Sequence, residues 1–146
     1  MSTKASSINA WEALFRAQVT VLRRLQNDFP TGEISLNEYD VLFNLSRQPD
    51  HRLRIRDLGR HLLITQPSIS RLVDRLVARG YVEKLEDPDD GRGTVVHLTP
   101  AGFDLFRRVA VKHSESIHHW MSALSEQELA ALETLTDRLR HGAENG

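Results

Sequence analysis

The sequence contains no cysteine, no long apolar run and no secretory leader pattern. Without cysteine the chain has no disulfide bond, no thiolate ligand for zinc and no thiol that could act as a redox switch. No apolar run approaches the roughly 18 residues that a membrane-spanning helix needs. The segment Met1–Ile8 lacks the apolar stretch of a signal peptide, so the expected location is the reducing cytoplasm.

Sequence signatures of catalysis are missing as well. There is no glycine-rich phosphate loop, no nucleophile elbow, no HExxH zinc motif and no pair of carboxylates in a plausible cleft. We therefore expect neither enzymatic activity nor a bound cofactor.

Basic residues are concentrated in the middle of the 146-residue chain, which is long enough for one domain with a real core. The net charge is only −1, but the segment from position 52 to position 84 contains eight basic residues and three acidic ones. The basic residues there are Arg52, Arg54, Arg56, Arg60, Arg71, Arg75, Arg79 and Lys84. A basic centre between mildly acidic ends is the electrostatic footprint of a nucleic-acid-binding module.

Helical patterns dominate the chain, with one short hairpin. Apolar residues recur at helical spacing, capping boxes begin at Ser35 and Ser125, and Gly80 has the position of a helix C-cap. The predicted helices are Ile8–Phe29, Leu36 up to a stop at Gln48-Pro49-Asp50, Ile55–Leu63, the stretch from an N-cap at Thr65 to Gly80, Pro100–Leu124 and the segment after Ser125. The predicted strands are Tyr81–Glu86 and Thr94–Leu98. We expect a mainly α (α+β) fold whose two-stranded hairpin packs on the third and fourth helices.

The third and fourth predicted helices have the pattern of a helix-turn-helix. Gly59 is the small residue where the second helix crosses the first, and Leu63 departs from the pattern because glycine is frequent in the turn. Apolar residues at fixed offsets join the two helices: Leu58, Leu62, Ile64, Ile69 and Leu72. The fourth helix is the most clearly amphipathic one in the chain.

The polar face of this fourth helix carries side chains that can read DNA. Gln pairs with adenine and Arg with guanine in the major groove, and Ser bonds bases or phosphates. The free N–H groups at the start of the helix would point at phosphate. The candidates are Thr65, Gln66, Ser68, Ser70, Arg71 and Arg75. An ordinary solvated face is the alternative, since every amphipathic helix exposes polar residues.

The loop of the hairpin favours the DNA-reading interpretation. It carries Arg92, and a guanidinium suits the negative potential of a narrow minor groove. Asp90 should not face phosphate, so we expect it to pair with Arg71 or Arg75 and to fix the loop. An unremarkable polar turn is the alternative. A winged helix that binds protein instead of DNA is the competing function, but it needs no such arginines.

Two stretches resemble the MarR family of transcriptional regulators. Asp90-x-Arg92-x-x-x-Val96-x-Leu98-Thr99, followed by Gly102, is similar to the family's wing, and Gln66 to Leu76 with Arg79-Gly80-Tyr81-Val82 resembles its recognition helix. Gly91 departs from the family, where many members have a further basic residue. The resemblance implies a winged helix-turn-helix at 35–99 and a helical dimerisation region at 1–34 and 100–146. It also implies a homodimer that binds a pseudo-palindromic operator in double-stranded DNA, a repressor role and release by a small ligand. The expected DNA-binding residues are Arg54, Thr65, Gln66, Pro67, Ser68, Ser70, Arg71, Arg75, Asp90 and Arg92.

A ligand site is a further implication of this resemblance. Family members often bind small aromatic or phenolic acids between the dimerisation helices and the winged domain. The expected lining residues are Trp11, Phe15, Phe43, His51, Asp57 and His61, with ordinary core or surface roles as the alternative. His113, Glu115, His118 and His119 have poor spacing for zinc, so we expect no metal site and interpret them as an interface or surface cluster.

Overall fold

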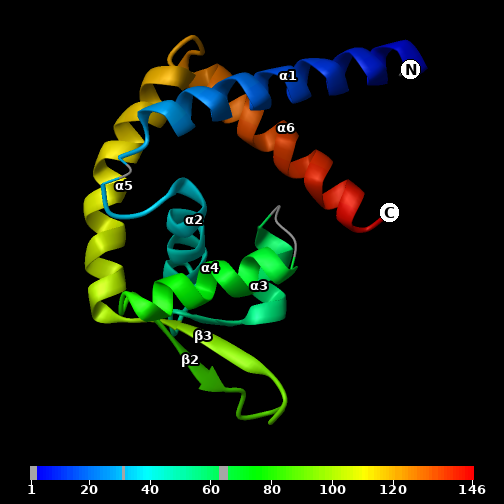
Figure 1. Ribbon diagram of the computed structural model, residues 1–146. Helices are drawn as coiled ribbons and strands as arrows, with labels where there is room; N and C mark the ends of the chain where they lie inside the picture. Colours follow the sequence, from blue (N-terminus) through cyan, green and yellow to red (C-terminus); the bar gives the residue numbers. More distant parts are fainter. Residues whose placement is uncertain (1–2, 31, 63–65) are drawn as a thin grey trace. The chain divides into compact units, whose positions relative to one another are not determined.

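The computed structural model describes residues 3–30, 32–62 and 66–146. Within these ranges the chain forms helices and short strands (Figure 1). The helices are α1 (Lys4–Asp28), α2 (Leu36–Ser46), α3 (Ile55–His61), α4 (Gln66–Ala78), α5 (Pro100–Met121) and α6 (Glu126–Glu144), and the strands are β1 (Arg52–Arg54), β2 (Val82–Glu86) and β3 (Thr94–Leu98). The predicted fold class, mainly α with a winged helix-turn-helix, is confirmed.

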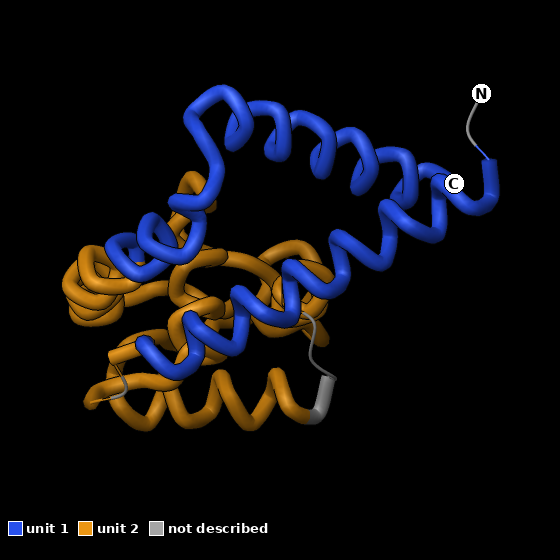
Figure 2. The backbone as a smooth tube through the Cα atoms, turned by 90° about the horizontal axis from the view of Figure 1, so that it is seen from above, with its two compact units in different colours: residues 1–28, 114–146 blue, residues 29–113 orange. Residues whose placement is uncertain are grey.

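The chain forms two compact units, coloured separately in Figure 2. The winged unit contains residues 29–113, with α2 to α4, the strands and most of α5. The helical unit contains residues 1–28 and 114–146, with α1, α6 and the end of α5. Residues 29–34 and 100–113 lie in the winged unit, while their predicted part in dimerisation stays a prediction.

Both predicted capping boxes are present. The Ser35 hydroxyl accepts the Glu38 N–H at 3.1 Å, and the Glu38 carboxylate accepts the Ser35 N–H at 3.0 Å. Ser125 and Glu128 repeat the arrangement at the start of α6. Each box satisfies two of the backbone donors that a helix start leaves without a partner. The helix ends are less predictable: α3 stops at His61 because Leu62 has extended backbone, and α5 stops at Met121 rather than at Leu124.

The turn that follows α4 is hydrogen-bonded to the residue that precedes α5. Gly80 adopts φ +80°, the left-handed conformation predicted for it, and this turns the chain out of α4. The Thr99 hydroxyl donates to the Gly80 carbonyl at 2.7 Å and accepts the Gly102 N–H at 3.1 Å, which caps α5. A Cβ on Gly102 would lie only 2.0 Å from the Tyr81 carbonyl oxygen. Only glycine permits so close an approach at this position.

The sheet has a third strand that the sequence analysis missed. The strand order is β1-β3-β2 and both pairs are antiparallel, with Arg54 opposite Val95 and Leu85 opposite the same residue from the other side. The predicted two-stranded hairpin therefore has a short extra strand along its β3 edge. β1 has three residues, Arg-Leu-Arg, and so small a segment has no detectable alternation of its own.

The core of the winged unit lies where α4 packs against its neighbours. Ile69, Leu72, Val73 and Leu76 on α4 are each at most 2% exposed, as the helical spacing predicts. They join a cluster that α2, α3, the sheet and α5 complete, whose members include Val41, Leu42, Leu45, Leu58, Val96, Leu98 and Leu105. Burial of one face fixes which side of α4 stays in solvent.

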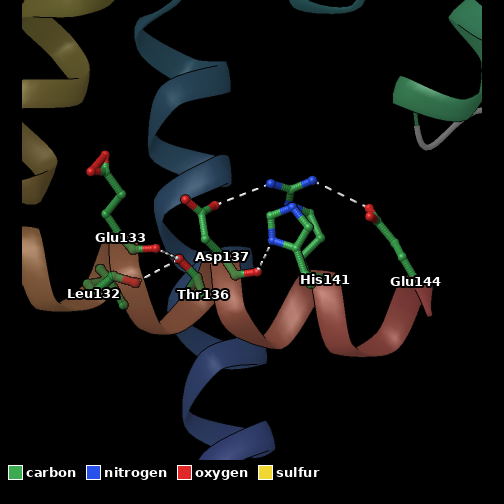
Figure 3. A network of polar contacts seen from close by, with 7 residues as sticks. Leu132, Glu133, Thr136, Asp137, His141 and Glu144 are labelled. Carbon is green, nitrogen blue, oxygen red and sulfur yellow. Dashed lines mark hydrogen bonds and ion pairs between the residues drawn. The ribbon is translucent and has the colours of Figure 1, made fainter. Parts of the chain in front are cut away.

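The described residues of the helical unit form no such core within one chain. Neither α1 nor α6 buries a residue, and large apolar side chains including Trp11 and Leu135 are more than half exposed. The polar side of α6 is satisfied locally (Figure 3): Thr136 donates to the carbonyls of Leu132 and Glu133, and Arg140 pairs with acids one turn away on either side. The surface of this unit that lacks a packing partner is therefore apolar.

Candidate nucleic-acid interface

The solvent side of α4 carries a row of polar side chains. Ser70, Arg71, Asp74 and Arg75 are exposed, on the face opposite the buried leucines. Asp74 is paired with Lys84 of β2, so its charge is compensated within the unit. Arg71 reaches back to the half-buried Ser68, with 3.5 Å between its Nη2 and the serine Oγ. Both arginines of this face, Arg71 and Arg75, are therefore exposed to solvent.

Part of the predicted helix-turn-helix lies outside the described residues. Leu63, Ile64 and the predicted N-cap Thr65 are not described, and Gln66 and Pro67 are placed only as the first backbone positions of α4. The predicted turn and the predicted phosphate contact of Thr65 stay predictions.

The loop between β2 and β3, residues 87–93, is closed by its own hydrogen bonds. The Asp87 N–H donates to the Gly93 carbonyl at 3.2 Å, and the Gly93 N–H donates to the Asp90 carbonyl at 2.8 Å. The Asp90 carboxylate accepts the Arg92 N–H at 3.0 Å. Arg92 itself is exposed. The turn therefore presents the Arg92 side chain from an ordered backbone.

The predicted partner of Asp90 is wrong. No ion pair joins Asp90 to Arg71 or Arg75 in the described part of the chain, because its carboxylate is used to fold the tip of its own loop. The acid that ties the loop to the rest of the unit is Asp87, three residues earlier. Its Oδ2 lies 2.6 Å from Nε of Arg54, and Asp89 lies 3.4 Å from Nη2 of the same arginine.

Asp87 is the residue that the sequence analysis missed. Only 4% of it is exposed, although it belongs to an otherwise exposed loop. The pKa of Asp87 is below its ordinary value because the N–H of Asp89, and then Arg54, favour the ionised carboxylate more than burial opposes it. No signal in the sequence indicates the pair of Asp87 with Arg54, because Asp87 is one of three acids in the loop and Arg54 is one of three arginines at positions 52, 54 and 56. Arg54, predicted to bind DNA, is held in this ion pair.

The predicted ligand residues lie in both units. Trp11 and Phe15 are neighbours on α1, with ring centroids 5.5 Å apart, and are 56% and 49% exposed. In the winged unit the Phe43 ring packs near Tyr39 and Phe106, and His51 stacks on Phe103 at 5.2 Å.

The two remaining predicted ligand residues are on α3. Asp57 pairs with Arg60 at 3.4 Å, an ordinary contact along one helix. His61 lies near Asp40, whose pKa is raised by burial and partly lowered by the histidine. The structure thus groups Phe43 with an aromatic cluster and leaves Asp57 in a local surface pair.

The histidines near the end of α5 do not form one cluster. His118 and His119 are exposed, whereas His113 is 8% exposed and packs edge-on against the rings of Phe29 and Tyr39. Burial lowers the pKa of His113. The interpretation of His113 as an interface or surface residue is therefore wrong. Among the described residues, no group of three or more His, Asp or Glu side chains could hold a metal ion.

No helix in the described ranges is long and apolar enough to cross a membrane.

Comparison with known proteins agrees with this arrangement. A model of the MarR family matches residues 33–93, which include α2, α3, α4 and the wing loop. The transcriptional regulator PecS of Dickeya dadantii is 28% identical over 127 residues, covering 86% of this chain and 76% of PecS. Relatives named MarR and MprA are 30% and 31% identical, but the chain spans only 58% and 56% of their length.

Two solved structures share the whole fold. Sco3205 of Streptomyces coelicolor, a MarR family regulator in complex with DNA, superposes with a TM-score of 0.80 at 24% identity, over 97% of this chain and 90% of that one. BpsR of Bordetella bronchiseptica, described with regulation of its DNA binding by 6-hydroxynicotinic acid, gives 0.76 at 23% identity, over 88% and 91%. The relatives named here are regulators rather than enzymes, as the sequence predicted. From the matched winged segment, the related sequences and the shared fold together, the chain belongs to the MarR family of transcriptional regulators.

Proposed function

We propose that the protein is a homodimeric regulator that binds a pseudo-palindromic site in double-stranded DNA. The observation that carries this proposal is that one unit presents two sets of outward basic side chains. Arg71 and Arg75 lie on the exposed face of α4, and Arg92 lies on the loop of the wing. The solved structure of Sco3205 with DNA supports the same use of this fold.

In this proposal α4 enters the major groove as the recognition helix. Its inner face is fully buried, so its outer face is held in one orientation. Arg71 and Arg75 can bond guanine, and Ser70 can bond a base edge or a phosphate. Gln66 and Ser68 are proposed to contact base edges, and Thr65 and Pro67 to contact the DNA backbone.

The wing would supply a separate contact with the minor groove. Arg92 is its outward cation, and Gly91 provides no second one. A guanidinium in the minor groove depends on groove width more than on base identity. The wing would therefore add affinity and a preference for narrow, A·T-rich flanks.

The helical unit supports the dimer. An apolar groove of about 790 Å³ lies in this unit and is lined by residues of α1 and α6 together with Met121 and Leu124. Exposed apolar side chains such as Ile8, Trp11 and Leu139 would remain in water in a monomer. A second copy of the same helices covers such a surface symmetrically, and it would place two α4 helices about one turn of DNA, roughly 10 bp, apart.

Repression and release by a ligand complete the proposal. A dimer on a promoter would exclude the transcription machinery, and a small aromatic or phenolic acid would lower its affinity for DNA. BpsR, which is described with such regulation, supports this step. Trp11, Phe15, Phe43, His51, Asp57 and His61 remain the proposed ligand residues.

The decisive experiment is selection of duplexes from a randomised pool by the purified protein, followed by gel-shift titration. We expect a two-fold symmetric consensus. Arg71→Ala should cost about 1–3 kcal/mol and relax specificity at one position in each half-site, while Arg92→Ala should weaken binding and reduce the salt slope by about one ion per wing. Arg140→Ala, in the local network of α6 (Figure 3), is the matched control and should bind normally.

Failure to enrich any sequence at low salt would overturn the proposal. The competing function, a winged helix that binds another protein, would then be favoured. If the Arg92→Ala variant bound DNA as tightly as the wild-type protein, only the proposed contact of the wing would be refuted.

A further inference from the structure

The buried acid of the wing calls for a physical explanation. Among the described residues the buried charged or polar side chains are Glu38, Asp87 and His113. Glu38 belongs to a capping box and His113 to the aromatic core. Asp87 caps no helix and belongs to a loop whose other acids are exposed, yet it is 4% exposed. Burial of a carboxylate costs desolvation free energy, so it is found only where charged and polar partners compensate the lost hydration.

The partners of Asp87 come from two different parts of the winged unit. Its Oδ1 accepts the N–H of Asp89 at 2.9 Å, inside the loop. Its Oδ2 lies 2.6 Å from Nε of Arg54, which ends β1 and stands at the N-cap position of α3. The ion pair therefore connects the wing loop to the beginning of the helix-turn-helix. Because the strand order is β1-β3-β2, the pair joins the end of one edge strand, β1, to the residue that follows the other edge strand, β2.

The geometry of the loop transmits the position of Asp87 to Arg92. Gly93 packs on Asp87 so closely that a Cβ there would lie 3.2 Å from its Cβ and its Oδ2. The Asp87 N–H bonds the Gly93 carbonyl, and the Arg92 N–H is held by Asp90. Arg92 is therefore followed by Gly93, which packs on Asp87, and its own N–H is bonded to Asp90 of the same turn.

We propose that the Asp87–Arg54 ion pair is a positioning device for the wing, and that Arg54 acts through Asp87 rather than by contacting phosphate. The pair would fix the angle at which the wing leaves the helix-turn-helix, and so the place where Arg92 meets the minor groove. This inference rests on the proposed DNA-binding function, although its structural part can be tested without DNA.

Charge alone predicts the opposite result for the key variant. Asp87→Asn removes a negative charge close to a polyanion, which by simple electrostatics should strengthen DNA binding. The positioning role predicts weaker binding, because the amide cannot compensate Arg54 and the loop loses its anchor. Glu86→Gln is the matched control. It removes one negative charge from the residue before Asp87, whose side chain is exposed and takes part in no ion pair among the described residues, and it should leave binding unchanged or slightly tighter.

Two measurements decide the matter. The first is the rate of trypsin cleavage after Arg92 below the melting temperature, which reports how firmly the loop is held without DNA. The second is affinity for a duplex that the wild-type protein has selected from a random pool. For Asp87→Asn we expect each to change by about tenfold, cleavage faster and binding weaker, which corresponds to about 1.4 kcal/mol.

Substitutions at Arg54 guard against a variant that fails to fold. Lysine keeps the charge but not the Nε contact, so Arg54→Lys should resemble Asp87→Asn if Arg54 positions the wing. It should resemble wild type if Arg54 is a point charge on phosphate. The double variant Arg54→Ala/Asp87→Asn should be no worse than either single variant, because both remove one interaction.

The outcomes separate the two levels of inference. Wild-type cleavage rates in both Asp87→Asn and Arg54→Lys would overturn the positioning role, whatever the DNA result. Faster cleavage with unchanged or tighter DNA binding would show that the ion pair orders the loop but does not place Arg92, and it would overturn the functional part. If the wild-type protein selects no DNA, the proposed function fails while the cleavage rates still decide the structural role.

Discussion

Replacement of Gly102 by alanine tests how closely α5 packs on the end of α4. An ideal Cβ at this position would lie 2.0 Å from the backbone oxygen of Tyr81 and 2.9 Å from Cδ1 of Leu98. Real Cβ atoms essentially never approach another heavy atom closer than 3.0 Å, so the gap must widen by about 1 Å. The obstacle is backbone and cannot rotate away. The Thr99 contacts to Gly80 and Tyr81, at 2.7 and 3.2 Å, would be stretched as well.

The magnitude follows from two opposing effects. Overpacking of this kind costs about 1–3 kcal/mol and more where the backbone must move. Alanine inside a helix recovers up to about 1 kcal/mol relative to glycine. We therefore expect the Gly102→Ala variant to lose about 2 kcal/mol of unfolding free energy.

Urea unfolding followed by circular dichroism, at one fixed protein concentration, measures this loss. Gly142→Ala in α6 is the matched control, since nothing lies within 4 Å of its Cβ. It should leave the stability unchanged or raise it by up to about 1 kcal/mol. If Gly102→Ala were as stable as Gly142→Ala, the close packing of α5 on Tyr81 would be refuted.

Three further predictions concern the pH response, a helix cap and the dimer. Burial lowers the pKa of His113 below its ordinary value of 6.5, so as the pH falls the unfolded chain binds a proton there before the folded chain does. The unfolding free energy should therefore decrease as the pH falls through about 6.5. A His113→Phe variant should show a smaller decrease of melting temperature over the same pH range. Ser125→Ala removes the capping box of α6 and should cost about 1 kcal/mol in thermal unfolding, with exposed Ser122→Ala as a milder comparison. Leu135→Asp places a charge in the apolar groove and should yield monomer in sedimentation velocity, where an intact dimer would contradict the proposed interface.

Helices were predictable from the sequence because their signals are local. A capping box spans four residues, and the apolar spacing of α4 repeats over its full length, so Ser35, Ser125 and the buried face of α4 were all visible. Gly80 was visible for the same reason, since only a few residues easily adopt its left-handed backbone.

The strand β1 and the role of Asp87 were not predictable in this way. β1 forms because β3 pairs with it, from Arg54 opposite Val95 to Arg52 opposite His97, and a strand of three residues has no detectable period of its own. Asp87 and Arg54 are also distant in sequence, and nothing near either residue indicates the other. The predicted ion pair between the loop and the rest of the unit is made by Asp87 and not by Asp90. The Asp90 carboxylate instead accepts the N–H of Arg92, two residues away in its own turn.

α5 has a mechanical consequence that follows from its two ends. It is one helix of 22 residues that begins in the winged unit and ends in the helical unit, and Thr99, the residue before it, is hydrogen-bonded to Gly80 in the turn after α4. At about 1.5 Å per residue it is a lever about 33 Å long. A tilt of about 5° at the far end would move the bonded end by about 3 Å, close to the spacing of about 3.4 Å between stacked bases in one strand. If α4 enters the major groove as proposed, a tilt of this size in α5 would therefore be enough to shift α4 by nearly one base pair.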